Sequence, residues 1–246
     1  MILSRITKHL KQQHWTAVLL DFVIVVLGVF IGIQVSNWNA ARLRAAQQHV
    51  YLERLRTDFE GIRDRIKEHF AIYNNAVEGG DYILTIVRAD EADFRKMKID
   101  GAKISRGFSG LNSPRIPPPA PATYDEMVSE GALSDIRNLE LRDKLAGYAR
   151  LQGVVQEVAH VVNDHFVRQS PILNRYFITH AVVDPRALSG IHDDVVSYDI
   201  EGMRGDRDFA IAVTLLRDNA LNSLEQRKIQ MREIDEILSL LDKELG

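Results

Sequence analysis

The chain has 246 residues, a formal net charge of −3 and no cysteine. The absence of cysteine excludes disulfides, thiolate metal sites and cysteine nucleophiles. The near-neutral charge gives no sign of the basic face that nucleic-acid binding usually needs, so we expect no nucleic-acid partner. Aromatic residues are only 7% of the chain and glycine is moderate, which argues against an all-β sandwich and against a disordered chain.

The N-terminal region predicts one transmembrane helix over residues 16–37, preceded by a short basic tail over residues 1–15. Asp21 is the only ionisable residue from Thr16 to Val35. About 20 apolar residues at roughly 1.5 Å per residue cover the roughly 30 Å hydrocarbon layer of a bilayer. The lipid bilayer is therefore the first expected partner.

Two tryptophans, Trp15 and Trp38, flank the apolar run. Their separation corresponds to about 34 Å of helix, which suits indoles that anchor opposite headgroup regions. A soluble core helix does not explain this bracketing. A cleaved signal peptide fits less well than an uncleaved signal anchor, because the run is long and no small-x-small cleavage site follows it directly.

The predicted orientation depends on the charges near the ends of this helix. Three basic residues precede it and three follow it, which gives a tie (Arg5, Lys8 and Lys11; Arg42, Arg44 and Arg54). The purely basic tail is typical of a signal anchor with its N-terminus inside the cell. In a bacterium this places a single-pass protein in the inner (plasma) membrane. The soluble domain is then extracytoplasmic, and periplasmic in a Gram-negative cell.

Three residues of the apolar run are candidates for helix packing in the membrane. Gly28 and Gly32 form a G-x-x-x-G pair, which lets two helix backbones approach closely. Asp21 is costly in the hydrocarbon layer unless it finds a partner or reaches the headgroups. A homo-oligomer, or a contact with another membrane protein, would use these residues. The alternative is a lone span that tolerates its charge.

Residues 38–246 predict a helical soluble domain. Apolar residues recur at three- and four-residue steps over residues 52–77. This stripe belongs to a helix expected over residues 40–88, unless the Gly79-Gly80 pair breaks it. A short helix is expected over residues 93–104.

Five of the seven prolines lie in residues 113–122 and force an extended segment. A stiff crossover between two parts of the bundle is the favoured interpretation, and a recognition strand for an aromatic groove is the alternative. Thr123 and Glu126 then match a capping box, which would start a short helix that Gly131 ends.

Two more long helices complete the predicted bundle. Asn138 is placed to cap one of them, and Pro171 limits it. Residues 172–205 predict a short helix plus loops. The last helix starts near Asp206 with a heptad-like, coiled-coil pattern that Arg227 breaks, which indicates a polar gap or a bundle edge. The predicted class is all-α: an N-terminal transmembrane helix followed by an elongated antiparallel helical bundle.

Two blocks of the chain carry a resemblance. Residues 21–39 contain an acid, an apolar run with spaced glycines, Gln34 and a closing Asn37-Trp38-Asn39. They resemble the anchor of a widespread bacterial family of uncharacterised single-pass membrane proteins, although the acid is Asp21 where glutamate is more usual. Residues 123–133, with Leu139-Glu140-Leu141-Arg142 after them, are similar to a second block of that family. The resemblance implies the architecture above and implies no activity.

The sequence offers little that points to chemistry. It has no phosphate-binding loop, dinucleotide fingerprint, zinc-protease motif or nucleophile elbow, so we predict no catalytic residue and no cofactor. His160 and Asp164 share a predicted helix face at a spacing of four, and His192 could supply a third metal ligand. The plainer interpretation is that these are solvated surface residues.

Three functions follow from these observations. The favoured one is a membrane-anchored interaction or scaffold protein, oligomeric with itself or bound to another membrane or envelope protein. The alternative is a sensor subunit that binds a small ligand in its bundle and signals through the membrane helix. The third is a metal-dependent enzyme with an unrecognised site, although the absence of motifs favours a protein that is not an enzyme.

Overall fold

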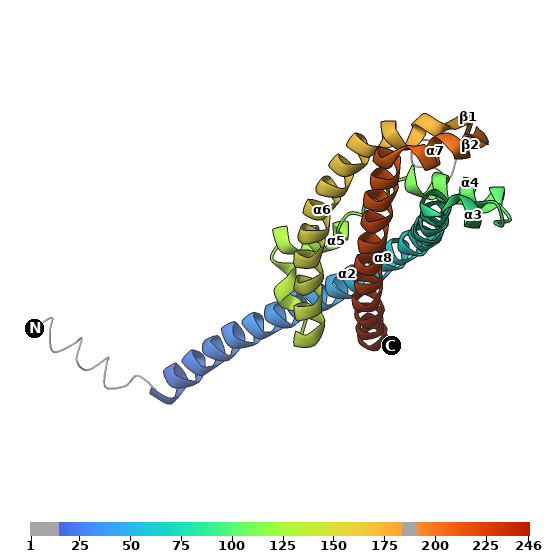
Figure 1. Cartoon of the computed structure of the whole chain (residues 1–246). Helices are drawn as coiled ribbons and strands as arrows, with labels where there is room; N and C mark the ends of the chain where they lie inside the picture. Colours follow the sequence, from blue (N-terminus) through green and yellow to red (C-terminus); the bar gives the residue numbers. More distant parts are fainter. Residues whose placement is uncertain (1–14, 184–190) are drawn as a thin grey trace, which may run out of the picture. The chain divides into compact units, whose positions relative to one another are not determined.

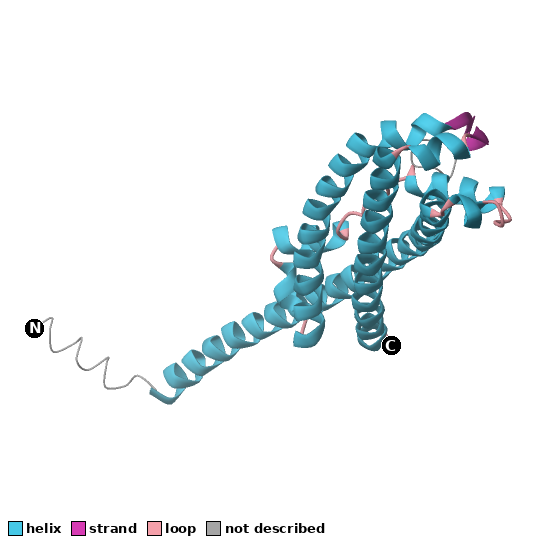
Figure 2. Ribbon diagram, viewed as in Figure 1, coloured by secondary structure: helices cyan, strands magenta, loops and turns pink. Residues whose placement is uncertain are grey.

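The computed structural model describes residues 15–183 and 191–246, and for residues 15–18 and 191–193 it describes the backbone only. Helices dominate the structure, as the all-α prediction requires (Figure 2). Among the described residues the only strands form one antiparallel pair, β1 (Phe177–Val183) with β2 (Ile191–Tyr198). Residues 172–205 were predicted as a short helix plus loops; the region does contain a short helix, but the strands, which were predicted as loop, were missed.

The first long helix, α2, spans Trp15–Arg88. The chain divides into two units within this helix, one ending at Val50 and the other covering Tyr51–Gly246. In the first unit the large apolar side chains from Leu19 to Val35 are exposed. By length and composition this helix can cross a membrane, a condition that a signal sequence near an N-terminus also meets.

The second unit is a bundle of three long helices: α2 from Tyr51 onward, α6 (Leu139–Leu173) and α8 (Arg207–Leu245). As predicted, Asn138 caps α6, with its side chain accepting a hydrogen bond of 3.1 Å from the Leu141 amide. Asp206 caps α8 and accepts from the Asp208 and Phe209 amides. The helices therefore begin where short polar side chains satisfy their free N–H groups.

Polar contacts define the direction of the helices. Asp242 near the end of α8 pairs with Arg56 of α2 at 2.9 Å, and Arg217 near its start pairs with Asp81 of α2 at 2.9 Å. Likewise Glu233 pairs with Lys144 of α6 at 3.1 Å. In each case the later a residue lies on α8, the earlier its partner lies on the neighbouring helix. The bundle is thus antiparallel about α8, which lies beside α6 in Figure 1.

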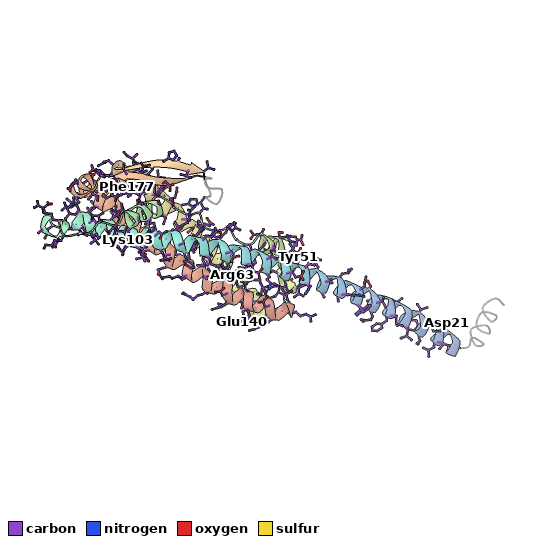
Figure 3. The ribbon with its side chains drawn as sticks, turned by 90° about the vertical axis from the view of Figure 1, so that its right-hand side faces the viewer. Asp21, Tyr51, Arg63, Lys103, Glu140 and Phe177 are labelled. Atoms are coloured by element: carbon purple, nitrogen blue, oxygen red, sulfur yellow. The ribbon has the colours of Figure 1, made fainter. Side chains whose placement is uncertain are left out.

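The apolar core of the bundle consists of two clusters. Figure 3 shows Tyr51 and Glu140 toward one end of the bundle and Phe177 and Lys103 at the other. The first core cluster lies at the Tyr51 end and contains Tyr51, Leu52, Leu55, Phe59, Ile62, Ile66, Met127, Ile136, Leu141, Leu145, Tyr148, Ile234, Ile237, Leu238, Leu240 and Leu241. The second core cluster lies at the Phe177 end and contains Tyr73, Ala76, Ile83, Leu84, Ile86, Ile104, Phe108, Leu111, Leu173, Phe177, Met203, Phe209, Val213, Leu216, Ala220 and Leu224.

Two short helices follow α2: α3 (Glu91–Phe94) and α4 (Gly101–Leu111). The single helix predicted over residues 93–104 is wrong, because Asp100 caps a helix that starts after it. Gly79 does not break α2 and instead permits close packing. A Cβ added at Gly79 would lie 2.0 Å from the Gly107 Cα, so two glycines let α2 and α4 touch backbone to backbone.

The segment from residue 113 to residue 121 has no regular secondary structure and leads from α4 to α5 (Ala122–Ser129). Since α4 belongs to the second core cluster and α5 to the first, the chain crosses between the clusters here. The predicted capping box is wrong: the Thr123 amide donates to Asp58 of α2 at 3.0 Å, and Glu126 pairs with Arg54 instead. A left-handed Gly131 follows α5, as predicted, before the 3-10 turn η1 (Ala132–Asp135).

A cap of mixed structure closes the end of the bundle at the second cluster. Helix α6 continues through Pro171 for two further residues, so this proline lies in its last turn and does not end it directly. The 3-10 turn η2 (Asn174–Tyr176), the two strands and α7 (Ile200–Gly205) follow. Phe177 of β1 stacks on Phe108 of α4 with ring centroids 4.0 Å apart. The strands are therefore held by the core, which local sequence patterns do not reveal.

Candidate functional site

A polar layer lies between the two core clusters, beside the partly buried Phe70, which packs against both. On α2 the first cluster ends at Ile66 and the second begins at Tyr73, and on α8 the gap lies between Leu224 and Ile234. Three polar side chains from this level are almost fully buried: Gln152 at 3% exposure, Arg227 at 2% and Gln230 at 0%. We call these three residues together with the half-buried His69 the polar layer.

A chain of hydrogen bonds crosses the layer. Arg227 Nη1 donates to Gln230 Oε1, and Gln230 Nε2 donates to Gln152 Oε1. Gln152 Nε2 then donates to the Pro118 carbonyl oxygen at 2.5 Å. The chain links α8, α6 and the proline segment, and every donor in it points the same way. It satisfies both buried amides, as a buried polar network requires.

The Arg227 guanidinium is only partly satisfied by these contacts. Its Nε has no hydrogen-bond partner among the described residues, and no Asp or Glu of the described chain forms an ion pair with it. Burial lowers the pKa of Arg227, opposed by the Tyr73 hydroxyl beside it. A buried charge without a counter-ion is expensive for a fold. The layer therefore lowers stability where an apolar core would raise it.

Other groups without partners gather around Arg227. His69 Nδ1, Arg115 Nε and the Tyr148 hydroxyl are buried and, within the described ranges, have no hydrogen-bond partner. Burial and the positive charges of Arg227, Arg115 and Arg65 lower the pKa of His69 to about 4. Burial also raises the pKa of the Tyr148 hydroxyl. The layer is thus electropositive, and it keeps His69 neutral at ordinary pH.

A cleft of about 290 Å³ opens beside the layer, between α2, the proline segment, α6 and α8. Arg227, Tyr73 and Ser223 line it from the bundle side, and Arg115 lines it from the proline segment. The α6 wall is largely apolar and carries a few polar side chains: Val155, Val158, Ala159, Val162, Gln156, His160 and Asn163. Concave sites with an apolar wall and a few convergent polar groups are typical of small-ligand binding.

The predicted metal ligands are not gathered into a metal site among the described residues. His160 and Asp164 are both exposed on α6, and the side chain of His192 lies outside the described residues. Among the described residues, no group of three or more His, Asp or Glu side chains is arranged to hold a metal ion. His160 instead lies at the rim of the cleft.

The predicted membrane residues all lie in the first unit. Asp21 and Trp38 are exposed on α2, and a Cβ at Gly28 or Gly32 would meet nothing within 4 Å. Trp15 begins the helix, and its side chain lies outside the described residues. The open surface at both glycines leaves room for a second helix, as the predicted packing role requires.

Comparison with known proteins found no relative of this chain. The chain matches no family model, no curated protein and no solved structure. The family resemblance of the anchor therefore stays a prediction, and function has to be argued from the geometry alone.

Sequence reasoning missed most of the cleft. The signal it did find was Arg227, whose break in the heptad pattern was assigned to a polar gap or a bundle edge, and the structure selects the polar gap. Gln152 and Gln230 fall on the same helix faces as the apolar stripes and could have been found by the same test. Nothing in the local pattern marks His69 or Arg115, because their role depends on helices distant in sequence.

Proposed function

We propose that the protein is a single-pass membrane protein whose helical domain binds a small ligand in the cleft. It would act as the sensor or binding subunit of a larger assembly. The observation that carries this proposal is Arg227, a buried charge with no acidic partner, at the wall of a cleft. Groups that cost stability and face a cavity are commonly kept for binding or catalysis.

The ligand-binding proposal is tested on the full-length protein in nanodiscs. A library of small polar and amphipathic metabolites is screened for compounds that raise the melting temperature, because a ligand that binds only the folded state stabilises it. We expect hits that are lost in Ala159→Phe, a variant that fills the cleft from its α6 wall. Hits that bind Ala159→Phe unchanged, or no hits at all, would contradict the proposal.

The membrane anchor is the second part of the proposal. Its support is an exposed apolar helix of sufficient length, with a tryptophan at residue 38 and no lysine, arginine or glutamate from Leu19 to Val35. The absence of cysteine makes labelling tests free of background. We expect the protein to resist carbonate extraction from membranes. Extraction into the soluble fraction would contradict the anchor.

We further propose that the bundle faces the periplasm. An impermeant maleimide should then label Ser129→Cys, an exposed position of α5, in intact spheroplasts of a Gram-negative host. It should label Ser4→Cys only after lysis. The reverse pattern would place the bundle in the cytoplasm and leave the ligand-binding proposal intact.

An interaction or scaffold role is the second candidate, and one observation favours it. Leu43, Ala46 and Val50 are all exposed, and their steps of three and four residues continue the face of Gly28 and Gly32. This face suits self-association. Crosslinking in native membranes, followed by mass spectrometry, should recover a dimer that Gly32→Ile and Leu43→Lys weaken. Recovery of monomer alone would contradict this role for the face, and recovery of a specific second protein would identify a partner.

A further inference from the structure

We propose that the cleft is a binding site for a small organic carboxylate, with the charged head at Arg227 and Arg115 and the apolar body against α6. This inference rests on the proposed ligand-binding function and narrows it to one chemical class. It follows from three features of the cleft: its charge, its unused hydrogen-bond donors and the composition of its walls.

The charge of the cleft has one sign. Two arginines line it, and among its described lining residues there is no Asp or Glu. The remaining polar lining groups are neutral hydroxyl, amide and imidazole groups, from Tyr73, Ser223, Gln156, Gln226, Asn163 and His160. In a region of low dielectric, two uncompensated guanidinium groups attract an anion strongly and repel a cation.

Arg227 has N–H donors left over for a bound carboxylate. A guanidinium has five N–H donors. One donates from Nη1 to Gln230, another donates to the Tyr73 hydroxyl, and Nε has no partner among the described residues. Arg115 also has a buried Nε without a partner in the described chain. A planar carboxylate matches the fork geometry of an arginine and accepts two parallel hydrogen bonds. Its bound charge would supply the counter-ion that Arg227 lacks.

The apolar walls argue for an organic acid over an inorganic anion. Val155, Val158, Ala159 and Val162 form one side, and Pro114, Ile116 and Pro117 form another. An inorganic phosphate or sulfate would leave these surfaces in contact with water. The volume of about 290 Å³ lies at the small end of ligand sites, which favours an acid of a few carbons or one ring over a nucleotide or a long acyl chain.

The deciding experiment measures binding to the full-length protein in nanodiscs by isothermal titration. The probes are hexanoate and benzoate, their neutral amides hexanamide and benzamide, and inorganic phosphate. We expect both carboxylates to bind at least about tenfold more tightly than the amides or phosphate. The amides lose the charge-assisted hydrogen bond, and phosphate loses the apolar contact with the walls. Salt should weaken carboxylate binding only slightly, since the charge is buried.

Variants assign the effect to residues. Arg227→Met and Arg115→Met should each weaken benzoate binding about tenfold or more, and Arg227→Lys should restore part of it, because it keeps the charge and loses the fork. The matched control is Arg232→Met, which removes the same charge from an exposed position of the same helix and should change nothing. If Arg227→Met fails to fold, Arg115→Met and Ala159→Phe give the same readout from two other elements.

Three results would overturn the inference. If the amides bind as tightly as the carboxylates, the ligand need not be an anion, and only the broader ligand-binding function would stand. Carboxylate binding that survives both Arg227→Met and Arg115→Met would place the site elsewhere. Failure of every anionic probe at millimolar concentration would also refute the inference, whereas the proposed function would still stand on a neutral compound from the library screen.

Discussion

The same three helices contribute to the two core clusters and to the polar layer between them, but the two kinds of region differ in what they bury. In the first core cluster Leu55, Ile66 and Leu141 are each 0% exposed and surrounded by other apolar side chains. In the layer, Arg227 and Gln230 are as deeply buried, yet they are polar and one of them is charged. Each buried leucine or isoleucine contributes about 1.5–3 kcal/mol to stability. The clusters therefore hold the bundle together, and the layer weakens it where the cleft opens.

The largest expected effect comes from removing apolar volume from a cluster. Leu55→Ala should destabilise the bundle by about 2–5 kcal/mol, because the cavity it leaves cannot fully collapse. Urea unfolding followed by circular dichroism measures the change. Leu139→Ala, at a site that is 60% exposed, is the control and should change stability by less than about 0.5 kcal/mol. Equal losses would mean that the first core cluster is not the stabilising region.

The next effect is a pH dependence that arises in the polar layer. Because the pKa of His69 is about 4 in the folded protein and about 6.5 when unfolded, the unfolded state binds more protons between these values. Stability should be full above pH 6.5, fall by up to about 3 kcal/mol as the pH drops to 4, and level off below that. The Arg227, Arg115 and Arg65 charges reinforce this direction.

The pH dependence is checked by melting curves from pH 7 to pH 4 for the wild type and His69→Gln. The variant should lose most of the decline, because the amide does not take up a proton. His160→Gln, at an exposed position of α6, is the matched control and should keep the decline. A decline of the same size in His69→Gln would assign it to other groups and remove the layer as its source.

A pair of glycines in α2 gives effects of opposite sign. Gly79→Ala should destabilise the protein by about 1–3 kcal/mol, because its Cβ would meet the Gly107 backbone at 2.0 Å and force α4 away. Gly61→Ala, with nothing within 4 Å of its added Cβ, should stabilise it by about 0.5–1 kcal/mol through helix propensity. Thermal melting distinguishes the two, and stabilisation by both would show that α4 is not packed on α2 as described.

The smallest effect is the most informative about the layer. Arg227→Met should change stability by less than about 1 kcal/mol, or raise it, since an apolar side chain of similar size replaces an unpaired buried charge. Melting without any added ligand measures this. A loss of several kcal/mol would mean that the chain of hydrogen bonds through Gln230 and Gln152 is a structural element, and the contrast between layer and clusters would fail.

Much of the helical architecture was predictable because its signals are local. The stripes of α2, α6 and α8 repeat at helical spacing, and Asn138 and Asp206 cap helices at the residues expected. Predictions failed where distant residues decided the outcome. Asp58 of α2, and not the local Thr123–Glu126 pair, satisfies the start of α5. Phe177–Val183 and Ile191–Tyr198 were predicted as loop, but they form paired strands. Phe177 packs on Phe108 of α4.

The sequence by itself determined the helical class, the long apolar run near the N-terminus and the break in the last helix at Arg227, because each depends on residues adjacent along one helix. Only the tertiary structure decided that a chain of hydrogen bonds leads from Arg227 to the proline segment. His69 and Arg115 lie nearby. The reason is physical: burial and the electric field at a site depend on all the elements around it. Three helices and an extended segment line this one cleft, and no single one of them supplies all of its polar groups.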